Sequence, residues 1–163
     1  MEIEKNIQVS VVMGSQSDWQ IMRVACDLLE KLDVSYEKKI VSAHRTPDRL
    51  YDYANSLRKR GVKVVIAGAG GAAHLPGMIA SKTNIPVIGV PISATDLRGA
   101  DSLYSIVQMP RGYPVATMAI GAPGAFNAAI FATQVLAVSD KVIGQKIQDW
   151  RADITNRVKD EPE

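Results

Sequence analysis

The chain has 163 residues, which is about the length of one domain. Apolar residues make up 47% and charged residues 22%, a composition that supports a packed core and excludes a disordered tail or a collagen-like fibre. The 19 basic and 17 acidic residues leave a net charge of +2, which excludes the strongly basic surface of a nucleic-acid-binding protein.

Short apolar runs alternate with helical patterns from the start of the chain. Residues 7–13 are rich in β-branched side chains and predict a strand. Residues 18–32 place apolar side chains on one stripe at helical spacing and predict an amphipathic helix. A second strand is predicted at 34–41 and a second helix at 47–60.

The same alternation continues through the middle of the chain. It predicts strands at 62–67, at 86–90 and near 114–119, with short helices at 75–82 and around 102–108. Strands that read as continuous apolar runs and alternate with helices are typical of a parallel sheet covered on both faces. The sequence therefore predicts an α/β fold of three layers, flavodoxin-like, with about five parallel strands.

The last third of the chain differs in pattern. Residues 124–138 are rich in alanine and predict a helix that packs closely against another helix. After Asp140, a good helix start, apolar residues recur at spacings of three and four: Ile143, Ile147, Trp150, Ile154 and Val158. We expect a single domain over 1–163, with a core at about 7–138 and a C-terminal oligomerisation helix at about 140–159. The alternative is that this helix packs on the domain's own sheet.

Membrane and export signals are not expected. No apolar stretch approaches the roughly 18 uncharged residues that a membrane span requires. Residues 1–6 are acidic and polar, unlike the start of a secretory signal. The single cysteine cannot form a disulfide within the chain, which favours a reducing, cytoplasmic location.

The first predicted strand is followed by a turn that could bind an anion. Gly14 permits a tight turn, and the hydroxyls of Ser15 and Ser17 with free backbone amides could hold a phosphate. Asp18 stands where a carboxylate could bind ribose hydroxyls. The alternative is an ordinary glycine turn with a capped helix.

The second strand is followed by a histidine and an arginine. Thr46 and Pro47 are typical of a helix start, so Ser42, His44 and Arg45 fall in the loop at the edge of the sheet. Imidazole is the side chain that most readily transfers protons near neutral pH, and a guanidinium binds phosphate well. A solvated histidine without function is the alternative.

The third strand is followed by small residues, with Gly70, Gly71 and Ala72 preceding His74 and Leu75. Such residues let the backbone approach a ligand. The string satisfies a relaxed dinucleotide fingerprint, but it follows the third strand and the fourth ends without a carboxylate, so we reject that interpretation.

The remaining chemistry-bearing residues are few. Two histidines and one cysteine form no recognisable metal-ligand spacing, and Cys26 is expected to pack in the core. From the residues alone, we expect a small phosphorylated metabolite as ligand, histidine-mediated proton transfer, and no bound cofactor or metal.

Three motifs together resemble a known enzyme family. Residues 12–19, 42–47 and 68–78 are similar to class I N5-carboxyaminoimidazole ribonucleotide mutase, a bacterial enzyme of purine synthesis, and the resemblance runs from about residue 8 to 151. Arg45 after His44 fits this class better than the related carboxylase that uses free carbon dioxide, where lysine is expected.

The resemblance implies a reaction and a set of roles. A carboxylate would move from the exocyclic nitrogen to ring carbon-4, by loss and recapture of carbon dioxide, without a cofactor. His44 would transfer the protons, and His74 would orient the carboxyl group. Substrate binding would involve Ser15, Ser17, Asp18, Ser42, Arg45, Gly70, Gly71, Ala72, His74 and Leu75. The family forms homo-octamers, which agrees with an unpartnered last helix.

Two other functions remain open from the sequence. One is an aminoimidazole ribonucleotide carboxylase that consumes carbon dioxide directly. The other is a nucleotide-binding module without catalytic activity.

Overall fold

A computed structural model describes residues 7–162. The polar start at 1–6, from which we expect no secretory signal, lies outside these residues. Five parallel strands form one sheet in the order β2-β1-β3-β4-β5. The strands are β1 (Val9–Met13), β2 (Tyr36–Ile40), β3 (Val64–Gly70), β4 (Val87–Ile92) and β5 (Ala116–Thr117). The predicted parallel sheet is therefore confirmed.

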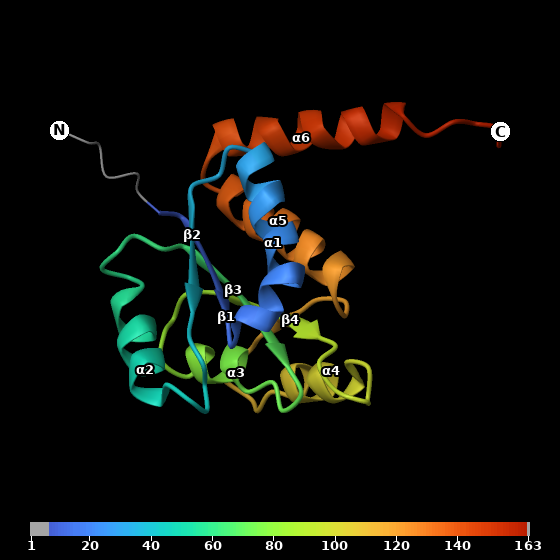
Figure 1. Ribbon diagram of the computed structural model, residues 1–163. Helices are drawn as coiled ribbons and strands as arrows, with labels where there is room; N and C mark the ends of the chain where they lie inside the picture. The colour runs from blue at the N-terminus through green and yellow to red at the C-terminus, as the bar shows by residue number, and fades with distance from the viewer. Residues whose placement is uncertain (1–6, 163) are drawn as a thin grey trace.

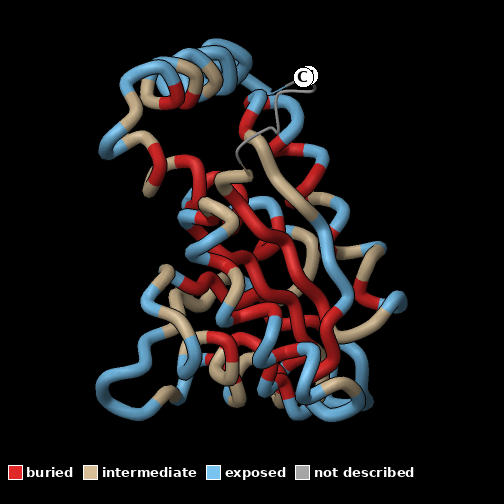
Figure 2. Tube along the Cα trace, turned by 90° about the vertical axis from the view of Figure 1, so that its left-hand side faces the viewer, coloured by how far each residue is buried: buried red, intermediate tan, exposed pale blue. Residues whose placement is uncertain are grey.

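Helices cover both faces of this sheet (Figure 1). They are the 3₁₀ turn η1 (Gln16–Asp18) and the helices α1 (Trp19–Lys31), α2 (Pro47–Ser56), α3 (Leu75–Ala80), α4 (Ala100–Val107), α5 (Ala122–Ala137) and α6 (Lys141–Asn156). One core cluster joins α1, α5 and the start of α6 to the sheet, and a second joins α2, α3 and α4 to its other face. Figure 2 shows that the buried part of the trace runs mainly through the strands between these layers.

Several element ends differ from the predictions. The third strand continues to Gly70 and the fourth to Ile92, because these segments pair with each other through Gly70 and Ile92. A Cβ on Gly68 would lie 2.3 Å from the sulfur of Met22, so this glycine lets α1 pack directly on the strand. The second helix ends at Ser56 instead of 60, and the fifth strand is only two residues long.

The last helix lies at the end of the molecule opposite the carboxyl ends of the strands (Figure 1). Asp140 caps it by accepting hydrogen bonds from the backbone N–H of Val142 and Ile143. Ile143 and Ile147 are buried in the core shared with α1 and α5, whereas Ile154 is 43% exposed. The chain therefore covers the apolar stripe of α6 as far as Trp150 and leaves Ile154, in the last turn, partly open.

Cys26 is buried, as the packing interpretation predicts, and burial raises the pKa of its thiol to about 11. Within residues 7–162, no helix combines the length and the apolar character that crossing a membrane demands.

Candidate active site

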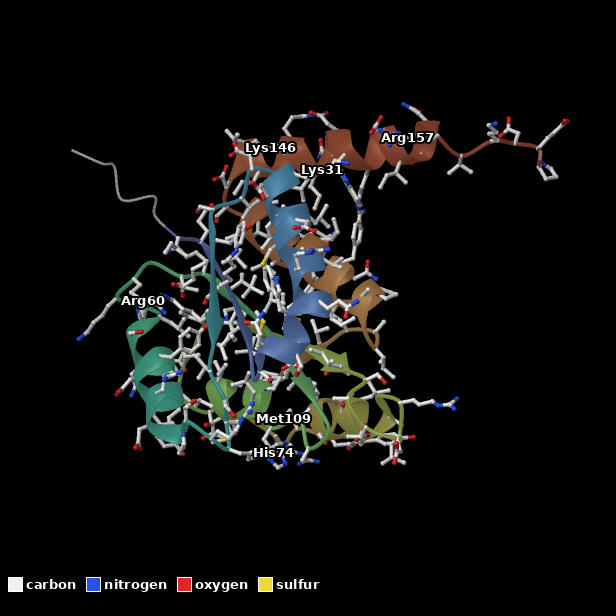
Figure 3. All side chains as sticks on the ribbon, in the orientation of Figure 1. Lys31, Arg60, His74, Met109, Lys146 and Arg157 are labelled. Atoms are coloured by element: carbon white, nitrogen blue, oxygen red, sulfur yellow. The ribbon has the colours of Figure 1, made fainter. Side chains whose placement is uncertain are left out.

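The candidate residues gather where the strands end. Met13, the last residue of β1, lies opposite Ile40 of β2 and Gly68 of β3, so the segments that follow these strands meet at one edge of the sheet. A cavity of about 410 Å³ opens there. Figure 3 shows His74 at this edge, far from Lys146 on α6 and from Arg157, which follows that helix.

All the candidate residues except Gly71 line this cavity. Its lining comprises Gly14, Ser15, Ser17, Asp18, Ser42, Ala43, His44, Arg45, Ala69, Gly70, Ala72, His74, Leu75 and Ala94. The sequence did not single out Ala43, Ala69 and Ala94, because an alanine carries no chemical signal. Ala94 also follows β4, whose predicted end fell two residues early.

The serine turn after β1 is organised by its own hydroxyls. Ser15 caps η1 by accepting hydrogen bonds from the backbone N–H of Ser17 at 3.3 Å and from the Ser17 hydroxyl at 3.0 Å. Ser15 and Ser17 both line the cavity, so this turn lies where an anion could be bound.

Asp18 supplies a buried carboxyl group to the cavity wall. It is only 6% exposed, and burial raises its pKa above the ordinary value. Hydrogen bonds from the backbone of Ser15 and Gly14, and the positive charge of Arg45, act in the opposite direction without cancelling the effect of burial. The free protein thus holds a poorly solvated carboxyl group at a surface that could receive polar ligand atoms.

The loop after β2 is tied both to itself and to the serine turn. Thr46 stands at the N-cap of α2, but its hydroxyl accepts from the Ser42 N–H at 2.9 Å and donates to the Ser42 carbonyl at 3.0 Å. The Arg45 side chain donates to the Ser42 hydroxyl at 3.2 Å and to the Gly14 carbonyl at 2.9 Å. Arg45 therefore connects the first and second turns.

The two histidines of the chain meet across the cavity edge. Nε2 of His44 lies 2.7 Å from Nδ1 of His74, and the rings are nearly perpendicular at 81°. A contact of this length between ring nitrogens requires a proton between them, so one imidazole donates and the other accepts. Both side chains are exposed, which leaves them accessible to a ligand in the cavity.

The glycine segment after β3 forms the opposite wall. Gly71 has φ of +64°, a conformation that glycine adopts without strain, and α3 then begins at the buried Leu75. A Cβ on Gly70 would lie 2.6 Å from that of Ala94. The backbone here is therefore packed closely against the segment after β4.

The cavity thus combines one guanidinium, one buried carboxyl group, two imidazoles and three serine hydroxyls. Over the described part of the chain, no three His, Cys, Asp or Glu side chains lie together as metal ligands would. The arrangement suits a polar anionic ligand with a nearby proton-transfer group.

Comparison with known proteins finds matches over most of the chain. A sequence model described as AIR carboxylase matches residues 8–157. The N5-carboxyaminoimidazole ribonucleotide mutase of Escherichia coli K12 is 55% identical over 156 residues, covering 96% of this chain and 92% of that protein. The Bacillus subtilis protein of the same name is 58% identical over 143 residues, 88% of each chain. A crystal structure of Treponema denticola PurE superposes with a TM-score of 0.83 over 92% of each chain at 24% identity, which establishes similarity of fold.

Proposed function

The chain belongs to the AIR carboxylase family, and from that premise we propose that it is a mutase acting on N5-carboxyaminoimidazole ribonucleotide in purine biosynthesis. The substrate carries a carboxylate on its exocyclic nitrogen, and the product carries it on ring carbon-4. Relatives with this name match nearly the whole chain at 55–58% identity. The observation that carries the proposal is the position of His44 in one cavity with the serine turn and the glycine segment.

The reaction needs one proton delivered and one removed. The bond between the exocyclic nitrogen and the carboxyl carbon breaks, carbon dioxide leaves, and the nitrogen takes up a proton from the His44 imidazolium. Carbon-4 of the ring then attacks carbon dioxide and forms the new bond. Neutral His44 removes the proton from carbon-4, which restores both the aromatic ring and the imidazolium. One histidine can therefore serve both transfers, since the proton count returns to its starting value.

The residues around His44 suit the nucleotide portion of the substrate. Arg45 and the turn from Ser15 to Ser17 would bind the phosphate, because a guanidinium and free amides both favour an anion. Asp18 would accept hydrogen bonds from the ribose hydroxyls. The Ser42 hydroxyl, which accepts from the Arg45 side chain, would keep that guanidinium oriented.

The glycine segment suits the reacting end. From Gly70 to Ala73 every residue is glycine or alanine, so backbone amides could approach the base and the carboxylate directly. His74, in contact with His44, would orient the carboxyl group in a supporting role.

A cofactor-free assay tests this function. The purified protein should interconvert the two carboxylated ribonucleotides without ATP, in buffer stripped of bicarbonate. If the forward reaction required added bicarbonate, the protein would be a carboxylase that uses free carbon dioxide. If the protein bound nucleotide without exchanging the carbon-4 proton, it would be a binding module only.

The proposal includes an octameric assembly in the cytoplasm. The apolar side chains left open at the end of α6 support assembly, because Ile154 in its last turn and Val158 just beyond it are 43% and 72% exposed in the single chain. The one cysteine, buried as a free thiol, is compatible with a reducing compartment.

A further inference from the structure

The segment between β4 and α4, residues 93–99, forms part of the cavity rim. Ala94 lines the same cavity as His44. A Cβ on Gly70 would lie 2.6 Å from that of Ala94, and a Cβ on Gly71 would lie 3.4 Å from the Thr95 methyl. The 93–99 loop therefore rests directly on the glycine backbone that is proposed to enclose the carboxylate.

This loop buries few of its own side chains. Residues 93–98 are exposed, and Leu97 is 64% exposed. The loop ends in two left-handed residues, Arg98 with φ of +52° and Gly99 with φ of +91°. That conformation is unfavourable for arginine. Since apolar burial contributes little here, polar contacts must hold the loop in place.

Asp101, in the first turn of α4, supplies the main polar contact. The Thr95 hydroxyl donates to its Oδ2 at 2.6 Å, and the Ser102 N–H donates to its Oδ1 at 2.9 Å. The same Thr95 hydroxyl accepts from the Leu97 N–H at 3.2 Å. A hydrogen bond to an ionised carboxylate is among the stronger kinds. With its hydroxyl fixed by Asp101, Thr95 holds the backbone of the loop beside Gly70 and Gly71.

The reaction creates a particular need for such a contact. Between bond breakage and bond formation, carbon dioxide is a small neutral molecule. Arg45 and Asp18 can hold the nucleotide, but charged side chains interact only weakly with neutral carbon dioxide. Its retention depends on closed cavity walls.

We propose that Asp101 is a positioning residue that, through Thr95, holds the 93–99 loop against Gly70 and Gly71 and thereby retains carbon dioxide for capture at carbon-4. This inference rests on the proposed function. It predicts that loosening the loop lets carbon dioxide escape and leaves the decarboxylated aminoimidazole ribonucleotide as a side product.

Paired variants at the two positions test this role. Asp101→Ala removes the acceptor. Thr95→Val removes the hydroxyl and keeps the methyl group, whereas Thr95→Ser keeps the hydroxyl. Asp96→Ala removes an exposed carboxylate from the same loop and controls for charge. For each variant, kcat, KM and the fraction of substrate lost to decarboxylation are measured, with spontaneous loss in enzyme-free buffer subtracted, and thermal unfolding is followed in parallel.

Asp101→Ala and Thr95→Val should lower kcat on the order of 10-fold, as for a misplaced group near the reacting atoms. KM should change little, and the decarboxylated fraction should rise. Thr95→Ser should recover most of the kcat and of the carbon dioxide retention that Thr95→Val loses. The double variant Asp101→Ala/Thr95→Val should be no worse than the poorer single variant. If Asp101→Ala does not fold, the comparison of Thr95→Val with Thr95→Ser tests the proposal by itself.

The proposal is overturned if both variants match Asp96→Ala, or if kcat and KM worsen together with the unfolding temperature and no gas escapes. It is also overturned if Thr95→Ser is as damaging as Thr95→Val. A wild-type protein that does not interconvert the two ribonucleotides would instead refute the proposed function itself.

Discussion

At the scale of single residues, the buried carboxyl group of Asp18 lowers the stability of the free protein. Burial raises the pKa of this carboxyl group above 3.8, so the native state binds its proton more tightly than the unfolded state does. Between 3.8 and the raised native pKa, the free energy of unfolding must therefore fall as the pH rises. At neutral pH the charged group lowers stability in the absence of ligand.

Asp18→Asn should accordingly raise the thermal unfolding temperature of the free protein at pH 7. The gain should shrink as the pH falls toward 3.8, since the wild-type carboxyl group becomes neutral there. Substrate affinity should fall, because the ribose hydroxyls lose a charged acceptor. Thermal unfolding across pH checks this, with Asp48→Asn as the exposed control. An unfolding temperature lowered equally at every pH would contradict it.

Arg45 is expected to act on binding. Replacing it with glutamine removes a charge-assisted contact to phosphate, which is worth about 1.5–3 kcal/mol. The dissociation constant should therefore rise on the order of 10- to 100-fold. Titration calorimetry checks this against Arg49→Gln, an exposed arginine on α2. Equal effects of the two substitutions would contradict a specific role for Arg45.

The sequence is sufficient to bring the candidate residues together where they stand at the ends of strands. Ser15, Arg45 and Gly70 could be placed at one edge because parallel strands bring their carboxyl ends together. The contact between His44 and His74 could not be predicted, since it depends on side-chain directions across 30 positions of sequence. The hydrogen bond from Arg45 to the Gly14 carbonyl could not be predicted either, because a local sequence pattern does not show which backbone acceptor of another turn lies within reach.

At the scale of elements, two glycines within helices differ in the space that a Cβ would have at their positions. A Cβ on Gly124, at the start of α5, would lie 1.7 Å from the Ala119 carbonyl oxygen. A Cβ on Gly144, within α6, would meet nothing nearer than 3.8 Å. The first glycine allows α5 to begin against the segment after β5, and the second has no such steric reason.

Gly124→Ala should therefore lower the free energy of unfolding on the order of 3 kcal/mol, because the backbone must shift. Gly144→Ala should raise it by up to about 1 kcal/mol, the usual gain in helix propensity. Chemical denaturation of the two variants side by side checks both. A tolerated Gly124→Ala would contradict the close contact at the start of α5.

Element types and their order could be predicted from periodicity, while their ends could not. The third strand extends through Gly70 because small residues pair with β4, although glycine ordinarily weakens a strand. The fifth strand shortens to Ala116–Thr117, since only these two residues pair with β4, opposite Ile88 and Gly89. The ends of both strands are set by pairing with β4, which a local sequence pattern does not contain.

At the scale of the whole molecule, the site and the open face of α6 lie at opposite ends (Figure 1). Trp150 packs against Phe126, with ring centroids 6.0 Å apart, while Ile154 beyond it is exposed. An apolar stripe left open on a helix of this length is typical of a surface that another copy covers.

The proposed assembly therefore predicts that Ile154→Asp shifts the protein to smaller species in sedimentation velocity. Ala152→Asp adds the same charge on the opposite side of the helix and should leave the assembly unchanged. The physical reason is that a carboxylate on the apolar stripe would be buried without a partner. If neither substitution changed the assembly, the α6 stripe would not be the contact between copies.

The most direct test of the account is turnover by His44→Asn, with substrate binding measured on the same preparation. Proton transfer by a positioned side chain contributes on the order of 100-fold or more to rate, so the variant should lose at least that much while still binding substrate. His74→Asn, in the supporting position, should retain measurable turnover. Normal turnover by His44→Asn would contradict the central claim that this imidazole moves the protons at the nucleotide ring.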